Sequence, residues 1–573
     1  MTLPVPMEWR LRKEDPALAC SISRKLEIGM ILARSMVARG VTSIEQAYDL
    51  LNPNLRRMHD PYLMRNMSRI VERVRSAVEG SERVLIHGDY DVDGITSTAL
   101  LYSFLKDSYP DLDIHTYLPS RFGDGYGLSE NCIKNEIEKG TDLLITVDCG
   151  IKAVDQIDMA AGNGMDVIIT DHHEPGEEIP RAFAVLDPKV QGTAYPFRDL
   201  AGVGVALKLA HAITLAGDVG TDIRDYMDLA TIGTIADMVP LTDENRLICH
   251  FGLERLASTS RVGLRALMRE SGMDLTRPVT STDVGFRLAP RLNSAGRLGH
   301  PDLALDLLLT KDRVDSDLFS RELTTLNYKR QAIGKKLVDD ILKEIDSGGM
   351  ENDPSIVVSG EEWNPGVIGI SASRIMDAMG RPVIVLSEEG KLARGSGRGP
   401  KGFDLVKALE SMSHLFMEFG GHKRAAGLTM RSDLIDDLRE GFNSYMELKY
   451  PDQVFRPVLD VDLDLLLEEL DIDSIQELEM IGPFGAGNPT VQISIRGVTV
   501  GNDLKAVGEG KHLKFTVEDD TSYLSCIWFN SGEAVDEMVP GTLLDISGQP
   551  DIHRWRGDVS VQLKVTDVHV LDG

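Results

Sequence analysis

The sequence has no long apolar run and few cysteines, and both absences narrow its class. No stretch of the 573 residues approaches the roughly 18 uninterrupted apolar residues that a membrane-spanning helix needs. Six charged residues near the N-terminus have no apolar run behind them, so we expect no secretory signal; they are Glu8, Arg10, Arg12, Lys13, Glu14 and Asp15. The five cysteines are scattered and form no CxxC pair, which argues against a zinc site or a disulfide framework and predicts a reducing cytoplasm.

Basic residues are also in short supply. The chain has 61 Lys and Arg against 90 Asp and Glu, so its formal net charge is −29. A general nucleic-acid coat protein is normally basic, and this balance argues against one. An enzyme that acts on nucleic acid is not excluded, because metal sites consume carboxylates and a basic channel can be local on an acidic body. No GxxxxGKS or GxxxxGKT motif occurs, so no ATP-driven motor is indicated.

What is present is a series of short apolar runs that end in polar clusters. Each run has the length and the β-branched composition of a buried strand, and helical stretches lie between the runs. Alternating strands and helices predict a parallel sheet, and functional residues gather at the carboxyl ends of such strands. The runs are residues 84–86 before His87–Gly94, residues 143–147 before Asp148–Gly150, and residues 167–170 before Asp171-His172-His173.

Carboxylates and imidazoles that converge on one sheet edge repel one another unless a cation neutralises them. Mixed Asp and His ligands suit Mn²⁺ or Mg²⁺, and a carboxylate that bridges two ions about 3.5–4 Å apart is the usual device for attack on phosphorus. A single Asp at a strand end is more often a helix cap or a turn residue. A fourth cluster, Gly233–Pro240, brings Asp237 to the end of another apolar segment, and four clusters are harder to explain as caps.

The second half of the chain has three further patterns. Apolar side chains recur at three- to five-residue steps over residues 315–346, which predicts one long helix. A second α/β unit follows, with β-rich runs at 356–358 and 383–386. From about residue 491 the chain consists of short alternating strands separated by Gly, Asp and Asn, a pattern typical of a small β-barrel.

Four of these clusters resemble, in order and spacing, the motifs of the DHH phosphoesterase superfamily. Other stretches are similar to its RecJ family of single-strand-specific 5′→3′ DNA exonucleases, and the resemblance covers nearly the whole chain. The superfamily motifs are His87–Gly94, Val147–Gly150, Asp171–His173 and Gly233–Pro240. The family-like stretches are residues 120–128, 289–297, 363–370, 420–427 (the DHH-associated signature) and 482–489 (the linker before an oligonucleotide-binding, or OB, barrel).

The resemblance implies an α/β fold class: a DHH parallel-sheet domain and a DHH-associated α/β domain joined by a long helix, with a C-terminal OB-type β-barrel. We expect these domains to follow a helical N-terminal extension. The expected boundaries are 1–80 for the extension, 81–314 for the DHH domain, 315–347 for the helix, 348–450 for the DHH-associated domain, 451–490 for a linker and 491–573 for the OB domain.

The resemblance also implies a centre of two ions, Mn²⁺ or Mg²⁺. Asp148 bridges the ions, His173 faces the scissile phosphate, and Asp171 orients the imidazoles, as metal-bound histidines generally require. Asp89 is an alternative near the site, although the spacing from His87 favours Asp91. The implied ligands are His87, Asp91 and Asp148 for one ion, and Asp93, Asp148, His172 and Asp237 for the other.

Substrate-binding candidates lie mainly outside these motifs. The glycine-rich stretch 394–402 allows backbone N–H groups to approach an anion, and its neighbours could hold a terminal 5′-phosphate. His422 either contacts phosphate or base or belongs to a turn with a solvated Lys-Arg pair. The phosphate-binding candidates are Ser373, Arg374, Ser396 and Arg398, and the strand-contact candidates are Arg121 and Arg291.

Basic residues alternate with aromatic ones in the predicted barrel, as suits stacked bases and paired phosphates of a single strand. Trp555, between Arg554 and Arg556, is our first choice for an exposed stacking residue. The alternative is that the aromatic residues are core and the charges are solvated. The other members of the pattern are Lys505, Lys511, Lys514, Phe515, Trp528 and Phe529.

Two further motifs receive no chemical role. Gly202-Val203-Gly204 lacks the third glycine of a dinucleotide fingerprint and does not follow a clear strand. Cys149 lies next to Asp148 and has no assigned base, so we interpret it as a small packing residue rather than a nucleophile.

Three functions compete at this point. The first is a metal-dependent 5′→3′ exonuclease on single-stranded DNA that serves repair and recombination. The second is an oligoribonuclease or small-nucleotide phosphodiesterase, against which the barrel argues. The third is a replisome scaffold, against which the complete ligand set argues. The expected partners are single-stranded DNA and, with it, helicase, single-strand-binding or replisome proteins, with no membrane and a monomeric state.

Overall fold

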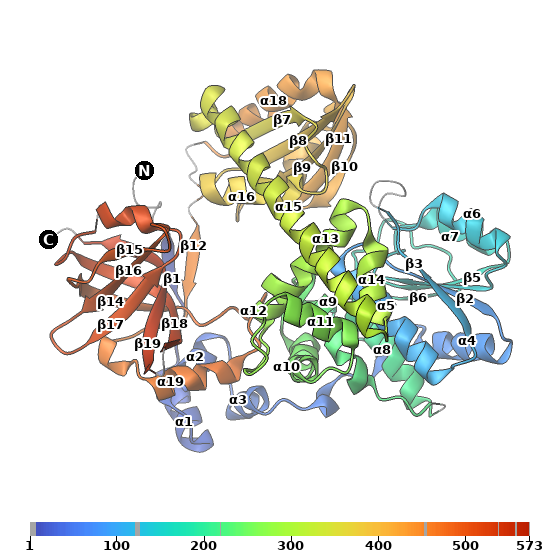
Figure 1. Ribbon diagram of the computed structural model, residues 1–573, viewed down its shortest axis with the longest axis horizontal. Coiled ribbons are helices and arrows are strands. Elements are labelled where there is room, and N and C mark those ends of the chain that lie inside the picture. Colours follow the sequence, from blue (N-terminus) through green and yellow to red (C-terminus); the bar gives the residue numbers. More distant parts are fainter. Residues whose placement is uncertain are drawn as a thin grey trace. The chain divides into compact units, whose positions relative to one another are not determined.

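The computed structural model describes residues 7–120, 127–217, 219–451, 455, 457–536, 538–555 and 558–571 (Figure 1). The chain divides into two compact units, each built from separate segments. Within the described ranges, every helix is too short or too polar to cross a bilayer. Unit 1 comprises Met1–Asn52, Ile333–Gly482 and Thr490–Gly573, and unit 2 comprises Pro53–Ala332 and Pro483–Pro489.

The core of unit 2 is a parallel sheet with the strand order β3-β2-β4-β5-β6. Every neighbouring pair is parallel, which confirms the predicted sheet. The three predicted runs are β2, β4 and β5, whereas β3 and β6 had no clear signal in the sequence. The strands are β2 (Arg83–His87), β3 (Asp113–Tyr117), β4 (Leu143–Val147), β5 (Asp166–Thr170) and β6 (Ala184–Leu186).

Helices cover both faces of this sheet. Side chains alternate between the two faces along each strand, so neighbouring residues of a strand pack against different helices. Ile86 and Ile145 pack with residues of α4, α5 and α8, whereas Leu85 and Leu144 pack with residues of α6 and α7. Burial on both faces explains why the strands are continuously apolar. The helices are α4 (Met67–Glu79), α5 (Val92–Ser108), α6 (Glu130–Glu138), α7 (Val154–Gly162) and α8 (Gly202–Leu215).

The rest of unit 2 is helical. Asp237 follows the end of helix α9 (Met227–Ala236), so the apolar segment before it is a helix and not a strand like the other three apolar runs. The apolar segment before it is buried on all sides, and periodicity alone does not separate a buried helix from a buried strand. The further helices are α10 (Asp243–Ala257), α11 (Val262–Glu270), α12 (Ser281–Asp283), a π-helical turn (Val284–Leu288), α13 (Ala289–Leu298) and α14 (Pro301–Leu309).

The predicted long helix is α15 (Arg313–Ser347). Asp312 caps its start, since its carboxylate accepts hydrogen bonds from the backbone N–H of Val314 at 2.7 Å and of Asp315 at 3.0 Å. Gly349, in the left-handed region at φ 67°, follows its end.

Unit 1 contains a mixed sheet with the strand order β10-β11-β9-β8-β7. Only β7 and β8 are parallel, and the other pairs are antiparallel. Residues 394–398 of the glycine-rich stretch, whose backbone N–H groups we expected to approach an anion, lie in strand β9, whose backbone pairs with β8 and β11 on its two sides. The elements are β7 (Ile356–Glu361), α16 (Ile368–Met379), β8 (Val383–Glu389), β9 (Leu392–Arg398), α17 (Leu405–Ser411), β10 (Phe416–His422), β11 (Ala425–Arg431) and α18 (Ile435–Lys449).

The C-terminal part of unit 1 is the predicted barrel. Strand β14 pairs with both β18 and β16, which closes the ring β14-β18-β19-β17-β16. Phe515 and Trp528 are buried in it, so for these two aromatics the core reading is correct. The strands are β12 (Val458–Val461), β13 (Leu463–Asp464), β14 (Ile493–Val500), β15 (Lys505–Val507), β16 (His512–Glu518), β17 (Tyr523–Trp528), β18 (Leu543–Trp555) and β19 (Asp558–Val570).

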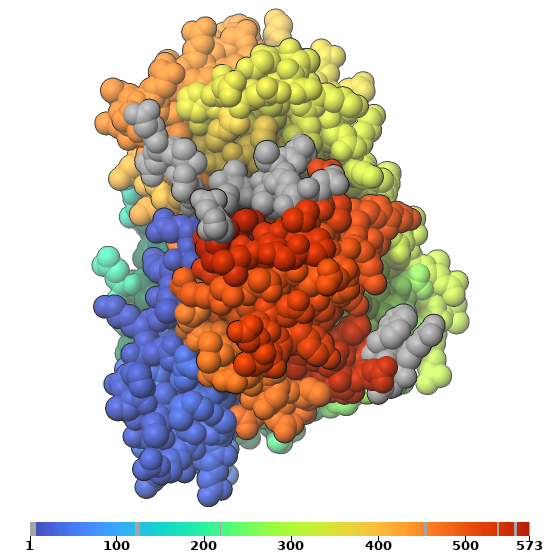
Figure 2. Space-filling model, turned by 90° about the vertical axis from the view of Figure 1, so that its left-hand side faces the viewer, coloured from blue at the N-terminus to red at the C-terminus, as the bar shows by residue number. Residues whose placement is uncertain are grey.

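The N-terminal segment of unit 1 packs against the C-terminal part (Figure 2). Strand β1 (Glu8–Leu11) pairs with β12, which corrects the purely helical reading of residues 1–80. The Trp9 ring stacks on His569 at 4.2 Å, and its indole N–H donates to Asp567 at 2.8 Å. The helices here are α1 (Pro16–Leu26), α2 (Met30–Ala38), α3 (Ile44–Leu51) and α19 (Ile472–Leu478).

Candidate metal centre

The first acidic cluster occupies the turn from β2 to α5. Asp91 is the N-cap of α5, and its Oδ1 accepts hydrogen bonds from the backbone N–H groups of Asp93 at 2.9 Å and Gly94 at 3.1 Å. Oδ1 of Asp91, a predicted metal ligand, therefore caps the helix. Gly94 has no room for a side chain, because a Cβ there would lie 2.5 Å from the backbone of Asp89.

Asp148 follows the last residue of β4 in a strained conformation. Its φ is 59°, in the left-handed region that non-glycine residues seldom adopt. The backbone N–H still donates to the carbonyl of Thr170 at 3.0 Å, so β4 and β5 remain paired to their ends. The residue is 2% exposed. Strain of this kind persists only where the surrounding structure enforces it, and it concentrates at functional sites.

Asp171 organises the segment at the end of β5. Its carboxylate accepts hydrogen bonds from the backbone N–H of Ile151 at 2.9 Å and of His172 at 2.7 Å, and it contacts Nδ1 of His173 at 2.8 Å. Burial alone raises the pKa of Asp171, but the hydrogen bond and the charge of His173 outweigh it and lower the pKa. Asp171 thus contacts the imidazole of His173 but only the backbone of His172, and its role in orienting the imidazoles stays a prediction.

His172 lies among three carboxylates from three different elements. Its Nε2 is 3.1 Å from Asp148 Oδ1, 3.8 Å from Asp93 Oδ2 and 3.7 Å from Asp237 Oδ2. Burial lowers the pKa of His172, which favours the neutral imidazole that binds metal ions. The tertiary structure thus gathers the residues that the resemblance assigned to the second ion.

Helix α8 holds the carboxylate of Asp93. The backbone N–H of Gly202 donates to Oδ2 at 2.7 Å, and that of Val203 donates to Oδ1 at 2.8 Å. The first turn of a helix presents unsatisfied N–H groups and the positive end of the helix dipole, so it favours an anion. Gly202 is required for the close approach, because a Cβ there would lie 2.6 Å from the Cβ of Asp148.

The sequence did not predict that the first turn of α8 holds the Asp93 carboxylate. Gly202-Val203-Gly204 received no role there, because it does not match a dinucleotide-binding motif. Two other neighbours of the centre, Asp187 and Lys189, were also missed, because the three-residue strand β6 before them is too short to stand out.

The buried carboxylates repel one another. Burial and the charge of Asp237 raise the pKa of Asp93 to about 7, and burial and the charge of Asp91 raise that of Asp237 to about 7. Burial and the charge of Asp93 raise the pKa of Asp148 as well. Both ring nitrogens of His172 are buried without a hydrogen bond of good geometry. A divalent cation supplies the missing charge and coordination, so these residues fit the expected metal site.

Among the described residues, three sets of ligand atoms lie close enough together to hold an ion. Within each set the atoms are within 4.8 Å of one another. Two of the sets contain Asp148, the predicted bridging ligand, and one contains Asp89, the alternative to Asp91. The sets are Asp148, His172 and His173; Asp93, His172 and Asp237; and Asp89, Asp91 and Asp148.

His87 ends β2 and is fully buried. Its ring stacks against Tyr117 at the end of β3, with 5.3 Å between ring centroids. Its Nδ1 lies 3.7 Å from Sγ of Cys149. Burial raises the pKa of the Cys149 thiol, which supports the interpretation of Cys149 as a packing residue.

In unit 1, three of the phosphate-binding candidates form one cluster. Arg398 Nε donates to Ser373 Oγ at 3.0 Å, and its Nη1 donates to Ser396 Oγ at 2.8 Å. Gly369 leaves room for this cluster, since a Cβ there would lie 2.9 Å from Arg398 Nη2. Arg374 is exposed. The backbone N–H groups of β9 are engaged in the sheet, so the cluster offers side chains rather than a backbone loop to an anion.

The other substrate-binding candidates differ in their surroundings. His422 is exposed at the end of β10, where the β10–β11 hairpin turns. Arg291 is 8% exposed and donates to Thr324 Oγ1 at 3.1 Å and to the carbonyl of Arg287 at 2.7 Å, so it joins α13 to α15. Arg121 and the side chain of Trp555 lie outside the described residues. The DNA contacts of all four stay predictions.

Comparison with known families gives three matches. The model described as the DHH family N-terminal domain matches residues 83–234, that of the DHHA1 domain matches residues 352–448, and that of the RecJ OB domain matches residues 461–567. The first match begins at β2, and the last begins at the final residue of β12.

Several curated proteins named RecJ are similar to this chain over nearly its whole length. The single-stranded-DNA-specific exonuclease RecJ of Bacillus subtilis is 39% identical over 98% of this chain and 71% of its own length. That of Escherichia coli is 31% identical over 95% and 96%. The crystal structure of Thermus thermophilus RecJ with Mn²⁺ covers 99% of this chain and 80% of its own, with a TM-score of 0.85 and 29% identity. The T. thermophilus protein has also been solved with Mg²⁺. The chain belongs to the RecJ family of metal-dependent, single-stranded-DNA-specific exonucleases.

Proposed function

We propose that this chain hydrolyses single-stranded DNA from its 5′ end, using two divalent ions, Mn²⁺ or Mg²⁺, at the carboxyl edge of the unit 2 sheet. The observation that carries the proposal is the position of His172 Nε2, within 3.8 Å of carboxylates from three separate elements. Such a cluster is costly without cations and suits phosphodiester hydrolysis with them.

The ligands are proposed as two sets that share Asp148. One ion takes His87, Asp91 and Asp148, with Asp89 beside them, and the other takes Asp93, Asp148, His172 and Asp237. When bound, the ions lower the pKa of the attacking water and stabilise charge on the phosphate and the leaving oxygen. The N–H groups of Gly202 and Val203 fix the Asp93 carboxylate, so its position does not depend on the ion.

His173 is proposed to contact the scissile phosphate. Its Nδ1 contacts Asp171, and an imidazolium carries a donor on each ring nitrogen, so its Nε2–H suits a phosphate oxygen as acceptor. Burial alone lowers the pKa of His173, but its hydrogen bond to Asp171 and the charge of that carboxylate raise it overall, which favours the charged donor. Asp171 is a positioning residue for this contact.

We propose that the 5′→3′ direction of cleavage comes from the cluster of Arg398, Ser396 and Ser373. A guanidinium flanked by two hydroxyl groups suits a terminal phosphate, which carries more negative charge than an internal phosphodiester. Arg374 and the exposed His422 add further cationic or hydrogen-bonding groups in unit 1. We propose that this cluster takes the 5′-phosphate, and that Arg121 and Arg291 support the strand.

The barrel offers a lysine row for the rest of the strand. Lys505 pairs with Lys514, Lys514 pairs with Ile527, and Ile527 pairs with Lys564, so the four side chains share one face across β15, β16, β17 and β19. Tyr523 and Phe529 are exposed, at 78% and 47%. Cations in a row with exposed aromatics suit a single strand, and Trp555 remains a further candidate.

We also propose a role in DNA repair and recombination, as a monomer. The net charge of −29 favours contacts with basic surfaces of other DNA-processing proteins rather than with nucleic acid outside the site. Helicases, single-strand-binding proteins and replisome proteins are the partners to test.

Digestion of end-labelled substrates tests the function. The purified chain with Mn²⁺ is given single-stranded DNA labelled at either end, duplex DNA, single-stranded RNA and dinucleotides. We expect mononucleotides from single-stranded DNA, with the 5′ label released first. Release of the 3′ label first would overturn the polarity, and preference for RNA or dinucleotides would overturn the substrate class.

A further inference from the structure

Lys189 is a cation at the edge of the metal centre that the ligand assignment leaves unused. It follows β6, the strand that pairs with β5, and the backbone N–H of Asp171 donates to the carbonyl of Leu186 at 3.1 Å. This pairing places the segment after β6 beside the segment that carries His172 and His173. The side chain of Lys189 is 19% exposed, an unusual degree of burial for a lysine.

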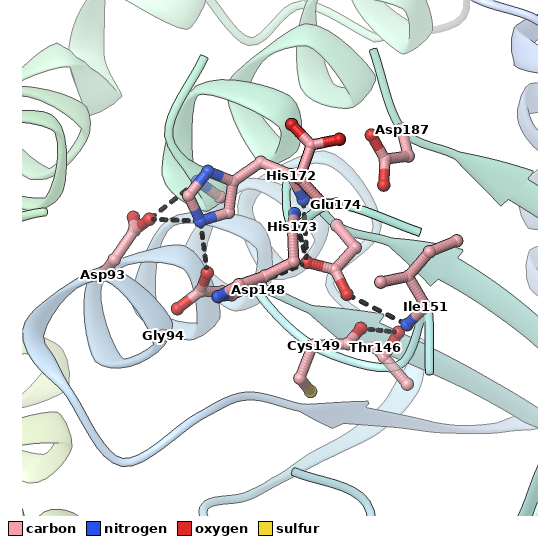
Figure 3. Close-up of polar contacts among 12 residues, drawn as sticks. Asp93, Gly94, Thr146, Asp148, Cys149, Ile151, His172, His173, Glu174 and Asp187 are labelled. Atoms are coloured by element: carbon pink, nitrogen blue, oxygen red, sulfur yellow. Dashed lines mark hydrogen bonds and ion pairs between the residues drawn. The ribbon is translucent and has the colours of Figure 1, made fainter. Parts of the chain in front are cut away.

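The backbone of Lys189 is fixed on both sides. Its N–H donates to Asp187 Oδ1 at 2.7 Å, and its carbonyl accepts a hydrogen bond from Arg198 at 2.9 Å. Asp187 is 5% exposed and lies beside the His172-His173 segment (Figure 3). These two hydrogen bonds hold the backbone that presents Lys189, which suits a residue that must keep its ammonium group in one place.

The ammonium group lies within electrostatic reach of the centre. Its Nζ is 3.8 Å from Glu174 Oε1, and Glu174 directly follows the His172-His173 pair. Because β6 pairs with β5 up to Leu186, the turn that carries Lys189 lies next to the segment that carries the proposed ligand His172.

We propose that Lys189 binds substrate: its ammonium group contacts a non-bridging oxygen of the scissile phosphate. The inference rests on the proposed function and adds to it a protein cation on the reacting phosphate. Negative charge on the phosphate oxygens is a feature of the substrate that the carboxylate cluster itself repels, so a fixed lysine next to that cluster draws the phosphate in. A lysine acts on phosphate as a point charge with three donors.

The alternative is that Lys189 serves only as the ion-pair partner of Glu174. That pair is partly solvated, with the Glu174 side chain 60% exposed, so its contribution to stability is small. The two readings differ in what the Glu174→Gln variant does. If Lys189 acts on substrate, Glu174→Gln should leave the cleavage rate unchanged. If Lys189 serves only as the partner of Glu174, Glu174→Gln should reduce the cleavage rate as much as Lys189→Met does.

The test compares Lys189→Met, Lys189→Arg and Glu174→Gln with the wild-type chain. We expect the single-turnover rate on 5′-phosphorylated single-stranded DNA to fall about 10- to 100-fold in Lys189→Met, since it loses a charged donor to the reacting group. Lys189→Arg, which keeps the charge, should recover at least part of the rate. Equal rates in wild type and Lys189→Met would overturn the proposal, as would an equal loss in Glu174→Gln.

A binding measurement locates the contact independently of turnover. Fluorescence anisotropy with Ca²⁺ in place of Mn²⁺ compares an all-phosphate oligonucleotide with oligonucleotides carrying one neutral methylphosphonate, at the first or at the sixth linkage from the 5′ end. The first-linkage change should weaken binding to wild type several-fold and binding to Lys189→Met by less than twofold. The sixth-linkage change should affect both proteins alike.

The outcomes separate the two proposals. If Lys189→Met loses as much affinity as wild type on the first-linkage methylphosphonate, Lys189 does not contact that phosphate and the inference fails while the exonuclease assignment stands. If the wild-type chain digests no single-stranded DNA, the proposed function fails and the inference falls with it.

Discussion

The backbone N–H of Gly202 donates to the carboxylate of Asp93 at 2.7 Å, and this contact joins the first turn of α8 to a proposed metal ligand on α5. The same glycine lies against Asp148, the proposed bridging ligand. One residue without a side chain thus sets the spacing of two carboxylates. Its importance comes from packing and not from any chemistry of its own.

The Gly202→Ala variant should damage the centre more than the fold. The new Cβ would lie 2.6 Å from the Cβ of Asp148, so either α8 or the ligand must move. We expect the overpacking to cost about 1–3 kcal/mol of stability. Cleavage should fall by about 100-fold or more, because a 1 Å misplacement is enough for that. Gly204→Ala is the matched control, since its Cβ meets only the Leu200 side chain, at 3.2 Å. Equal activity losses in the two variants would contradict this account.

Replacement of Asp148 tests the bridging role. Asp148→Asn keeps the volume and removes the charge that two ions share, so we expect turnover to fall at least about 1,000-fold and Mn²⁺ binding by calorimetry to weaken. Asp142→Asn is the control at the opposite end of β4, where the Asp142 side chain accepts the N–H of Arg83 at 2.8 Å. Substantial activity in Asp148→Asn would remove Asp148 from the shared position.

The stabilisation by metal should grow with pH. The pKa values of Asp93 and Asp237 are raised to about 7 in the folded chain without metal, above the roughly 3.9 of an unfolded chain. These two carboxyl groups therefore lower the stability of the folded chain as pH rises from about 4 to about 7. Over this range the folded state binds more protons than the unfolded state. A bound cation removes this loss. We expect Mn²⁺ to raise Tm more at pH 8 than at pH 5.5, and an equal rise at both values would argue against ligation by these carboxylates.

The Arg398 cluster should determine the response to the 5′ end. Arg398→Lys keeps a charge but loses the donors to Ser373 and Ser396. We expect the preference for 5′-phosphorylated over 5′-hydroxyl DNA to drop about 10-fold, with the maximal rate on long strands affected less. The exposed Arg374→Lys variant is the comparison. An unchanged end preference in Arg398→Lys would place the 5′-phosphate elsewhere.

The lysine row of the barrel should appear in the salt dependence of binding. Replacing Lys505 and Lys514 by Gln removes two phosphate contacts, and each contributes about 0.7 to the slope of log K against log salt for a single strand. We expect the magnitude of the slope to decrease by about 1.4 and cleavage of short oligomers to persist. Lys511→Gln is the control, since Lys511 pairs with Glu509. An unchanged slope would exclude this face as the DNA path.

Local signals in the sequence were enough for part of the fold. The continuous apolar runs before His87, Asp148 and Asp171 identified three buried strands, because a strand covered on both faces needs apolar side chains throughout. The apolar side chains that recur at three- to five-residue steps over α15 identified the long helix, because that spacing places them on one face of a helix. Phe515 and Trp528 could not be placed in this way, because the sequence pattern alone does not tell a stacking aromatic from a core one.

The sequence by itself determined the residue types of the centre and their attachment to the ends of three strands. The tertiary structure decided the rest. It brought Asp237 to His172 from the end of a helix, made Asp91 a helix cap as well as a candidate ligand, and placed the N–H groups of α8 on Asp93. It also placed Lys189 beside the centre. The physical reason is that strand signals are local, whereas the approach of α8, α9 and β6 to the sheet edge depends on packing between segments distant in the sequence.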